Sequence, residues 1–243
     1  MARKFMFLKT GASSFTRPTD WNNSENVVHC LGAGSRPGGG AYSAKDNVVL
    51  APGSVAYQVG AGNSVVDSWL VSSVTVMAKA GNGLTPGSAA SSVGDRKFSG
   101  GTRLSGSGYG GGGAAGPNGD GGNSTDMGPG DNSGGGGADG GDDIIEPMTG
   151  GLNRLGGAPP APGAGQTQGE ARPVAEVLWT QTSNGETAGP GPGGSEDNGA
   201  FNNNGANYGG GAGSFGTGIG GDGLIVLEWE PRPGDDMSFS IVG

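Results

Sequence analysis

The sequence predicts a mainly β protein, in which a small β sandwich formed from both ends of the chain carries a stack of extended glycine-rich helices. Three observations support this fold class. Short alternations of apolar and polar residues occupy the first 80 residues, glycine-rich tracts occupy most of the remainder, and a strongly apolar strand pattern returns at residue 224. Alternation with a period of two residues is typical of β-strands.

The composition excludes one side-chain core for the whole chain of 243 residues. Leu, Ile, Val and Phe make up about 16% of the residues, whereas ordinary globular domains exceed about 20%. The 58 glycines and 15 prolines make up about 30%, a level that by itself indicates low complexity. We therefore expect a small side-chain core beside a region held together by backbone contacts.

Five segments are predicted to be strands: residues 25–31, 47–50, 54–60, 73–80 and 224–230. The last segment is the most strand-like and stands alone after the glycine-rich tracts. Because an isolated apolar strand is unstable, it is expected to pair with the N-terminal sheet, beside residues 25–31. The predicted organisation is an N-terminal β anchor (1–99), a glycine-rich region with loop islands (100–223) and a returning strand (224–243).

The glycine-rich tracts, roughly 100–141, 150–169 and 185–223, have two interpretations. They are either flexible linkers or extended left-handed helices with three residues per turn. A three-residue spacing favours the helices, with glycines at 110, 113, 116, 119 and 122 and again at 210, 213 and 216. Interruptions at Thr125 and Ile219 disfavour a continuous collagen triple helix. Short rods that exchange backbone hydrogen bonds with neighbouring rods are expected instead.

Net charge, cysteine content and the lengths of apolar runs limit the classes of partner and location that are expected. The net charge of −9 disfavours nucleic acid, which requires a basic surface. The single cysteine, Cys30, excludes an internal disulfide. The apolar run at residues 5–8 is too short for a signal peptide, and no run approaches the roughly 20 apolar residues of a membrane span, so membrane insertion is not expected.

The chain offers few residues for catalysis or for cofactor and metal binding, and none of these roles is expected. The one histidine, His29, lies inside a predicted strand, where we expect a packed or surface side chain, and Cys30 is expected to be a small buried residue. Acidic residues at Asp139, Asp142 and Asp143 suggest calcium, but the surrounding nonapeptide occurs once and has Gly141 at its aliphatic position. No tract ends in the Gly-Lys-Ser/Thr of a phosphate-binding loop.

Non-glycine islands within the tracts are the candidates for recognition. Bulky, charged and amide side chains in exposed loops suit sugars or proteins. The alternative is that they plug the layer of rods or form a subunit contact. This packing role is favoured for the apolar and aromatic residues of the islands, and most for Trp179. The candidate residues are Asp142, Ile144, Ile145, Glu146, Trp179, Gln181, Asn184, Asp197, Phe201, Asn202 and Asn203.

The order of motifs along the chain resembles a known family. The segments are 14–34 (SFTRPTDWNNSENVVHCLGAG), 38–62 (GGGAYSAKDNVVLAPGSVAYQVGAG), 93–101 (VGDRKFSGG), 110–122 (GGGGAAGPNGDGG) and 207–229 (NYGGGAGSFGTGIGGDGLIVLEW). In this order they are similar to the glycine-rich proteins encoded in tail-fibre regions of tailed bacteriophages and prophages. Two segments depart from the usual pattern, because 31–37 replaces a longer glycine run and 65–70 (VVDSWL) replaces a glycine-led turn.

The resemblance implies a structural component of a phage tail fibre or tail tip, located in the virion and made in the host cytoplasm without a signal peptide. Related phage adhesins fold such tracts into polyglycine II sandwiches whose loops touch the host. The implied partners are other tail or fibre proteins and a host cell-surface receptor, either a glycan or an outer-membrane protein, and the implied assembly is a homotrimer.

Alternative functions remain open. One is a purely architectural virion protein. Another is an ice-binding protein, which would need a regular lattice of threonine or small residues, and a third is a disordered glycine-rich protein, whose usual Arg-Gly-Gly repeats are absent.

Overall fold

A computed structural model describes residues 2–103, 110–124, 178–191, 193, 204–213 and 218–232. This part of the chain is mainly β and contains no helix. The strands are β1 (Lys4–Leu8), β2 (Ser14–Thr16), β3 (Asn26–Leu31), β4 (Tyr42–Asp46), β5 (Ser54–Gln58), β6 (Ser68–Leu70), β7 (Val76–Ala78), β8 (Arg96–Phe98), β9 (Trp179–Thr180), β10 (Thr187–Ala188) and β11 (Leu224–Trp229).

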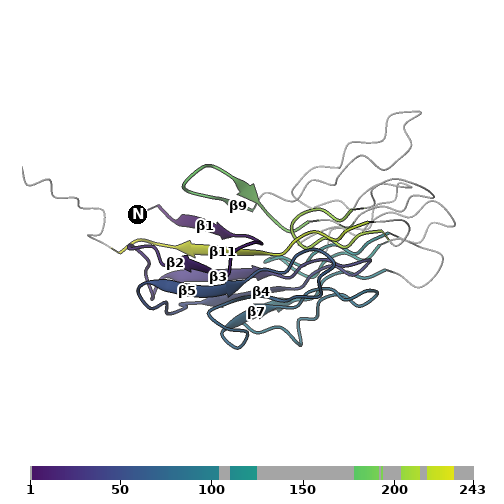
Figure 1. The fold of residues 1–243 in the computed structure, drawn as a ribbon, viewed down its shortest axis with the longest axis horizontal. Coiled ribbons are helices and arrows are strands. Elements are labelled where there is room, and N and C mark those ends of the chain that lie inside the picture. Colours follow the sequence, from purple (N-terminus) through teal and green to yellow (C-terminus); the bar gives the residue numbers. More distant parts are fainter. Residues whose placement is uncertain are drawn as a thin grey trace, which may run out of the picture.

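The first sheet has five antiparallel strands in the order β1-β11-β3-β4-β8 (Figure 1). The C-terminal strand β11 lies in its interior, where Ile225 is opposite Cys30 and Leu227 is opposite Val28. The predicted pairing of residues 224–230 with residues 25–31 is therefore confirmed. On its other side β11 pairs with β1, a strand that the pattern of residues 4–8 does not predict.

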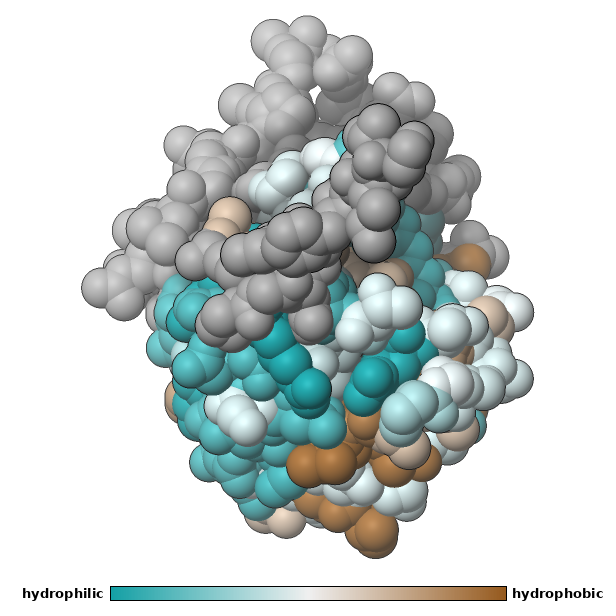
Figure 2. Space-filling view, turned by 90° about the vertical axis from the view of Figure 1, so that its left-hand side faces the viewer, coloured by the Kyte–Doolittle hydropathy of each residue, from teal (hydrophilic) through white to brown (hydrophobic). Residues whose placement is uncertain are grey.

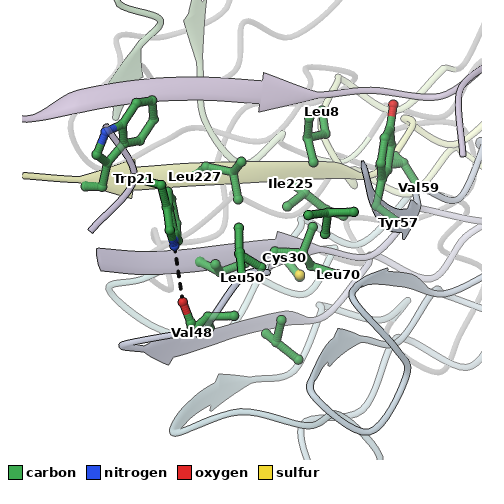
Figure 3. Close-up of a cluster of buried hydrophobic side chains, with 14 of the residues drawn as sticks. Leu8, Trp21, Cys30, Val48, Leu50, Tyr57, Val59, Leu70, Ile225 and Leu227 are labelled. Carbon is green, nitrogen blue, oxygen red and sulfur yellow. Dashed lines mark hydrogen bonds between the residues drawn. The ribbon is translucent and has the colours of Figure 1, made fainter. Parts of the chain in front are cut away.

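The second sheet has four strands in the order β2-β5-β6-β7 and packs against the first. Side chains from both sheets form one hydrophobic core, part of which is shown in Figure 3. Trp21 is buried there and its indole N–H donates a hydrogen bond to the carbonyl of Val48 at 3.4 Å. Cys30 is fully buried in this core, as predicted, and burial raises the pKa of its thiol.

Two strand predictions need correction. Residues 47–50 form no strand, because Asn47 turns the backbone with a φ of 55° and the side chain of Asn26 then hydrogen-bonds to both the N–H and the carbonyl of Val48. The strand of this region is β4, which ends just before Asn47. Of residues 73–80 only Val76–Ala78 form a strand, because residues 71–75 make the turn that reverses the chain after β6.

The outer face of the five-stranded sheet carries a second hydrophobic cluster. The short hairpin of β9 and β10 packs on this face through Trp179 and Ala188, which contact buried residues of β3, β4 and β11. The hairpin also covers the free edge of β1. There the backbone N–H of Thr182 donates to the carbonyl of Phe5, and the N–H of Phe5 donates to the hydroxyl of Thr182.

The glycine-rich segments gather at one end of the two sheets (Figure 1). They form isolated bridges but no regular strand, and they come from both halves of the chain: residues 32–41, 60–62, 79–88, 99–103, 110–124, 189–191, 193, 204–213 and 218–223. The N-terminal part of the chain thus contributes to this region as well as to the sheets. β1 begins and β11 ends at the opposite end of the molecule (Figure 1).

Candidate functional site

Hydrogen bonds between the glycine-rich segments repeat with a period of three residues. In residues 38–41 each backbone N–H donates to a neighbouring segment at 2.8 to 3.0 Å. The acceptors are, in order, the carbonyls of Gly83, Gly101, Gly209 and Lys79. The first and fourth acceptors lie on one segment, residues 79–83, so the direction of the bond recurs after three residues.

Residues 112–115 show the same recurrence. Their N–H groups donate, in order, to the carbonyls of Pro37, Gly122, Gly191 and Gly40, at 2.8 to 3.0 Å. The first and fourth acceptors again lie on one segment, residues 37–40. A β-strand uses only two hydrogen-bonding directions, one on each side, so this geometry differs from that of a sheet.

The segments touch through their backbones. A Cβ atom on Gly101 would lie 1.8 Å from the carbonyl oxygen of Gly122, and one on Gly112 would lie 2.1 Å from that of Gly101. Gly111 is equally close to a third segment, at 2.1 Å from the carbonyl oxygen of Gly211. No side chain fits at these positions, which explains the glycine content physically.

Asparagine and aspartate side chains bridge neighbouring segments, again at three-residue spacing. Asp120 and Asn123 accept hydrogen bonds from the backbone N–H groups of Ser99 and Thr102, at 2.7 and 2.9 Å. A second pair of side chains, also three residues apart, accepts backbone hydrogen bonds in the same way.

In that second pair, Asn204 and Asn207 accept from the N–H groups of Ile219 and Asp222, at 2.7 and 3.0 Å. Each side chain satisfies a backbone donor that would otherwise lack a partner on the adjacent segment. These four side chains therefore contribute to the backbone network itself.

Three candidate recognition residues lie together on the hairpin of β9 and β10. Trp179 is only 5% exposed, and its ring centroid lies 5.1 Å from that of His29. The packing role that the sequence favoured for this residue fits that position. The side-chain carbonyl of Gln181 accepts a hydrogen bond from the N–H of Phe7 at 2.7 Å, so it protects the edge of β1.

The third of these residues, Asn184, supports the turn of the hairpin. Its Oδ1 atom accepts from the side-chain amide of Gln181 at 3.1 Å and from the N–H of Glu186 at 2.9 Å. The remaining candidates lie outside the described residues: Asp142, Ile144, Ile145, Glu146, Asp197, Phe201, Asn202 and Asn203.

A buried polar cluster surrounds His29, which is 6% exposed. Its Nδ1 atom lies 2.7 Å from the hydroxyl of Tyr42, and its Nε2 atom lies 3.1 Å from Oε2 of Glu228. Nε2–H is suited to donate to the carboxylate of Glu228, and which of Nδ1 and the Tyr42 hydroxyl donates depends on the tautomer. Glu228 also forms an ion pair with Arg3.

Burial decides the role of this cluster. The hydrogen bond from His29 lowers the pKa of Glu228, and burial raises the pKa of Tyr42. Tyr42 is fully buried and Trp179 packs over His29, so a substrate could not reach the hydroxyl or the imidazole. The expectation of a packed histidine is confirmed. In the sequence, the position of Glu228 within an otherwise apolar strand was the one indication that it pairs with another polar residue, here His29.

Among the described residues, no group of three or more His, Cys, Asp or Glu side chains is placed to hold a metal ion. The same part of the chain contains no helix able to cross a membrane. No protein-family model matches the chain, and no curated protein matches it significantly. Function is therefore inferred from the chain's own residues.

Proposed function

We propose that the glycine-rich segments form a stack of polyglycine II helices, and that the protein is a structural component of a phage tail fibre or tail tip. The supporting observation is the recurrence of hydrogen-bond directions after three residues in segments 38–41 and 112–115. An extended left-handed helix has three residues per turn and no internal hydrogen bonds, so its N–H groups point in three directions toward neighbouring rods.

The way in which this region is held together supports a structural role. Its described interior consists of backbone contacts between glycines, and the polar cluster at His29 is enclosed by packing. Such a region displays loops on a rigid support, because loops that join ordered elements carry binding residues without disturbing the elements. We propose that the loops between the rods, including residues 142–146 and 197–203, contact a host glycan or outer-membrane protein.

The proposed assembly is a homotrimer joined to other tail or fibre proteins in the virion. Immunogold electron microscopy of tailed particles from a culture that makes the chain tests this location. Labelling at the fibre or tail tip is expected, and particles that carry no label would contradict a virion role.

Amide hydrogen exchange tests the stack. Protection is expected for Gly101, Gly112 and Gly113, whose N–H groups donate to other segments at 2.8 to 2.9 Å. Exchange of all three at random-coil rates would show that the rods are not formed.

Recognition is tested by replacing residues 142–146 and, separately, 197–203 with glycine and serine, and by measuring particle adsorption together with the melting temperature. Reduced adsorption at an unchanged melting temperature supports receptor contact through that loop. Normal adsorption by both variants would assign the protein a purely architectural role.

A further inference from the structure

Exposed valines mark the end of the sheets that lies opposite the glycine-rich segments. Val49 is 71% exposed in the loop between β4 and β5, and Val74 is 81% exposed in the turn between β6 and β7. Val71 lies in the same turn and is also exposed. Figure 2 faces this end of the molecule and shows hydrophobic residues gathered in its lower part.

The loop that carries Val49 is held in place by its neighbours. Asn26 Oδ1 accepts a hydrogen bond from the N–H of Val48 at 2.8 Å, and Asn23 Oδ1 accepts one from the N–H of Leu50 at 3.1 Å. Val48 and Leu50 are both buried in the core. Val49, between them, is therefore held outward by a fixed backbone, and a partner would lose little conformational entropy in ordering it.

A groove of about 400 Å³ adjoins this loop. Its lining includes the carboxylates of Glu25, Asp46, Glu228 and Glu230 and a single guanidinium, that of Arg3. Arg3 forms ion pairs with Glu228 and, at 3.0 Å, with Glu230. Glu25 forms no ion pair with another residue of the described ranges.

We infer that this end face, which consists of the three valines and the groove, docks a protein that presents apolar side chains beside arginine or lysine. The apolar side chains pack on Val49, Val71 and Val74, and a basic side chain enters the groove toward Glu25. The groove already holds one guanidinium, that of Arg3, which shows the chemistry it accepts.

Charge and area argue for this occupant. A second copy would bring a chain of net charge −9 and the same groove, whose four carboxylates exceed the guanidiniums of Arg3 and Arg96 that pair with three of them, and like charges that meet across an interface cost several kcal/mol. A standard interface buries about 800 Å² on each partner. Three valine side chains are too small for that, so the contact must extend over the acidic groove.

This inference names the partner class for the proposed structural role and rests on that role for the existence of a larger assembly. Its test uses the full chain and two synthetic amphipathic helical peptides with the same leucine face, one with lysine and one with glutamate on the polar face. Calorimetric titration is expected to show binding of the lysine peptide, at least about tenfold tighter than the glutamate peptide and weakened by salt.

Variants locate the binding. Val49→Asp and Val74→Asp should each abolish binding of the lysine peptide, and Glu25→Lys should weaken it severalfold. The matched control is Leu84→Asp, because Leu84 is 60% exposed but lies among the glycine-rich segments, and it should bind like the wild type. Melting temperatures of all variants should stay near that of the wild type, since each substituted side chain is exposed.

Four results would overturn the inference: no binding of either peptide, equal binding of both, equal loss of binding in the control variant, or self-association of the chain that Val74→Asp abolishes in sedimentation. The last result would assign the end face to a second copy. None of these results affects the exchange and particle-labelling tests of the proposed function, so the two proposals fail separately.

Discussion

Replacing Gly101 by alanine should lower the melting temperature by about 6–12 °C. The added Cβ would lie 1.8 Å from the carbonyl oxygen of Gly122, about 1.6 Å inside ordinary van der Waals contact, and the atom it meets is backbone. Overpacking costs about 1–3 kcal/mol. Moving the segment also strains two backbone hydrogen bonds of Gly101. Its carbonyl accepts from the N–H of Gly39, and its N–H donates to the carbonyl of Gly113. Each bond contributes about 0.5–1.5 kcal/mol to stability.

A loss of about 3 kcal/mol is therefore expected, and each kcal/mol shifts the melting temperature by about 2–4 °C in a chain of this size. Thermal unfolding followed by circular dichroism measures the shift. The control is Thr102→Ala, which keeps the neighbouring backbone and removes the hydroxyl that donates to the carbonyl of Leu84 at 3.1 Å and, at 3.4 Å, to that of Arg103, for a loss of about 1 kcal/mol. A Gly101→Ala protein that melts within about 2 °C of the wild type would refute the close-packing argument.

Three further substitutions test other parts of the structure. Trp179→Ala should lower the free energy of unfolding by about 3–5 kcal/mol, because it leaves a cavity in the buried site over His29. Denaturant titration measures this free energy, and unchanged stability would contradict the packing role. Glu228→Gln should be less stable than the wild type above pH 4.5, where the lowered pKa of Glu228 favours the folded state. The difference should vanish as the pH falls through the folded pKa, and a difference that persists would contradict this contribution. Asn204→Ala should speed hydrogen exchange at the N–H of Ile219, while an unaltered rate would show that the side-chain bond gives no protection.

The pairing of β11 was predictable because an apolar strand that follows a long glycine-rich stretch needs a partner, and only the N-terminal region offers one. β1 was missed for a physical reason. Met6 and Leu8 contact the core between the sheets, whereas Phe5 and Phe7 contact the cluster on the outer face. A strand covered on both faces has no alternation, so its short apolar run has no strand signature.

The glycine spacing indicated the type of structure but only part of its packing. In the sequence only every third glycine stands out, as at 110, 113 and 116. In the structure Gly111 and Gly112, which lie between those positions, also approach neighbouring backbones closely. Which segments become neighbours depends on tertiary structure, as residues 37–41 show by bonding to four different segments.

Contacts between side chains that are far apart in the sequence were not predictable at the candidate site either. His29 and Glu228 are 199 residues apart, and no local pattern links them. Gln181 and Asn184 are candidates from the sequence because their amide groups suit recognition. The structure uses the same amide groups to protect the edge of β1 and to close a turn.

The interior position of β11 has a consequence for how such chains can diverge. β3 leads into the glycine-rich region and β11 leads out of it, and the two strands are hydrogen-bonded neighbours. The entry and exit points are thus fixed side by side whatever the length of chain between them. Doubling the length of a loop adds only about 0.6 kcal/mol to the cost of closing it. Insertions and deletions in the loops that join the ordered segments of this intervening chain should therefore cost little, whereas the strands and the close-packed glycines must stay as they are.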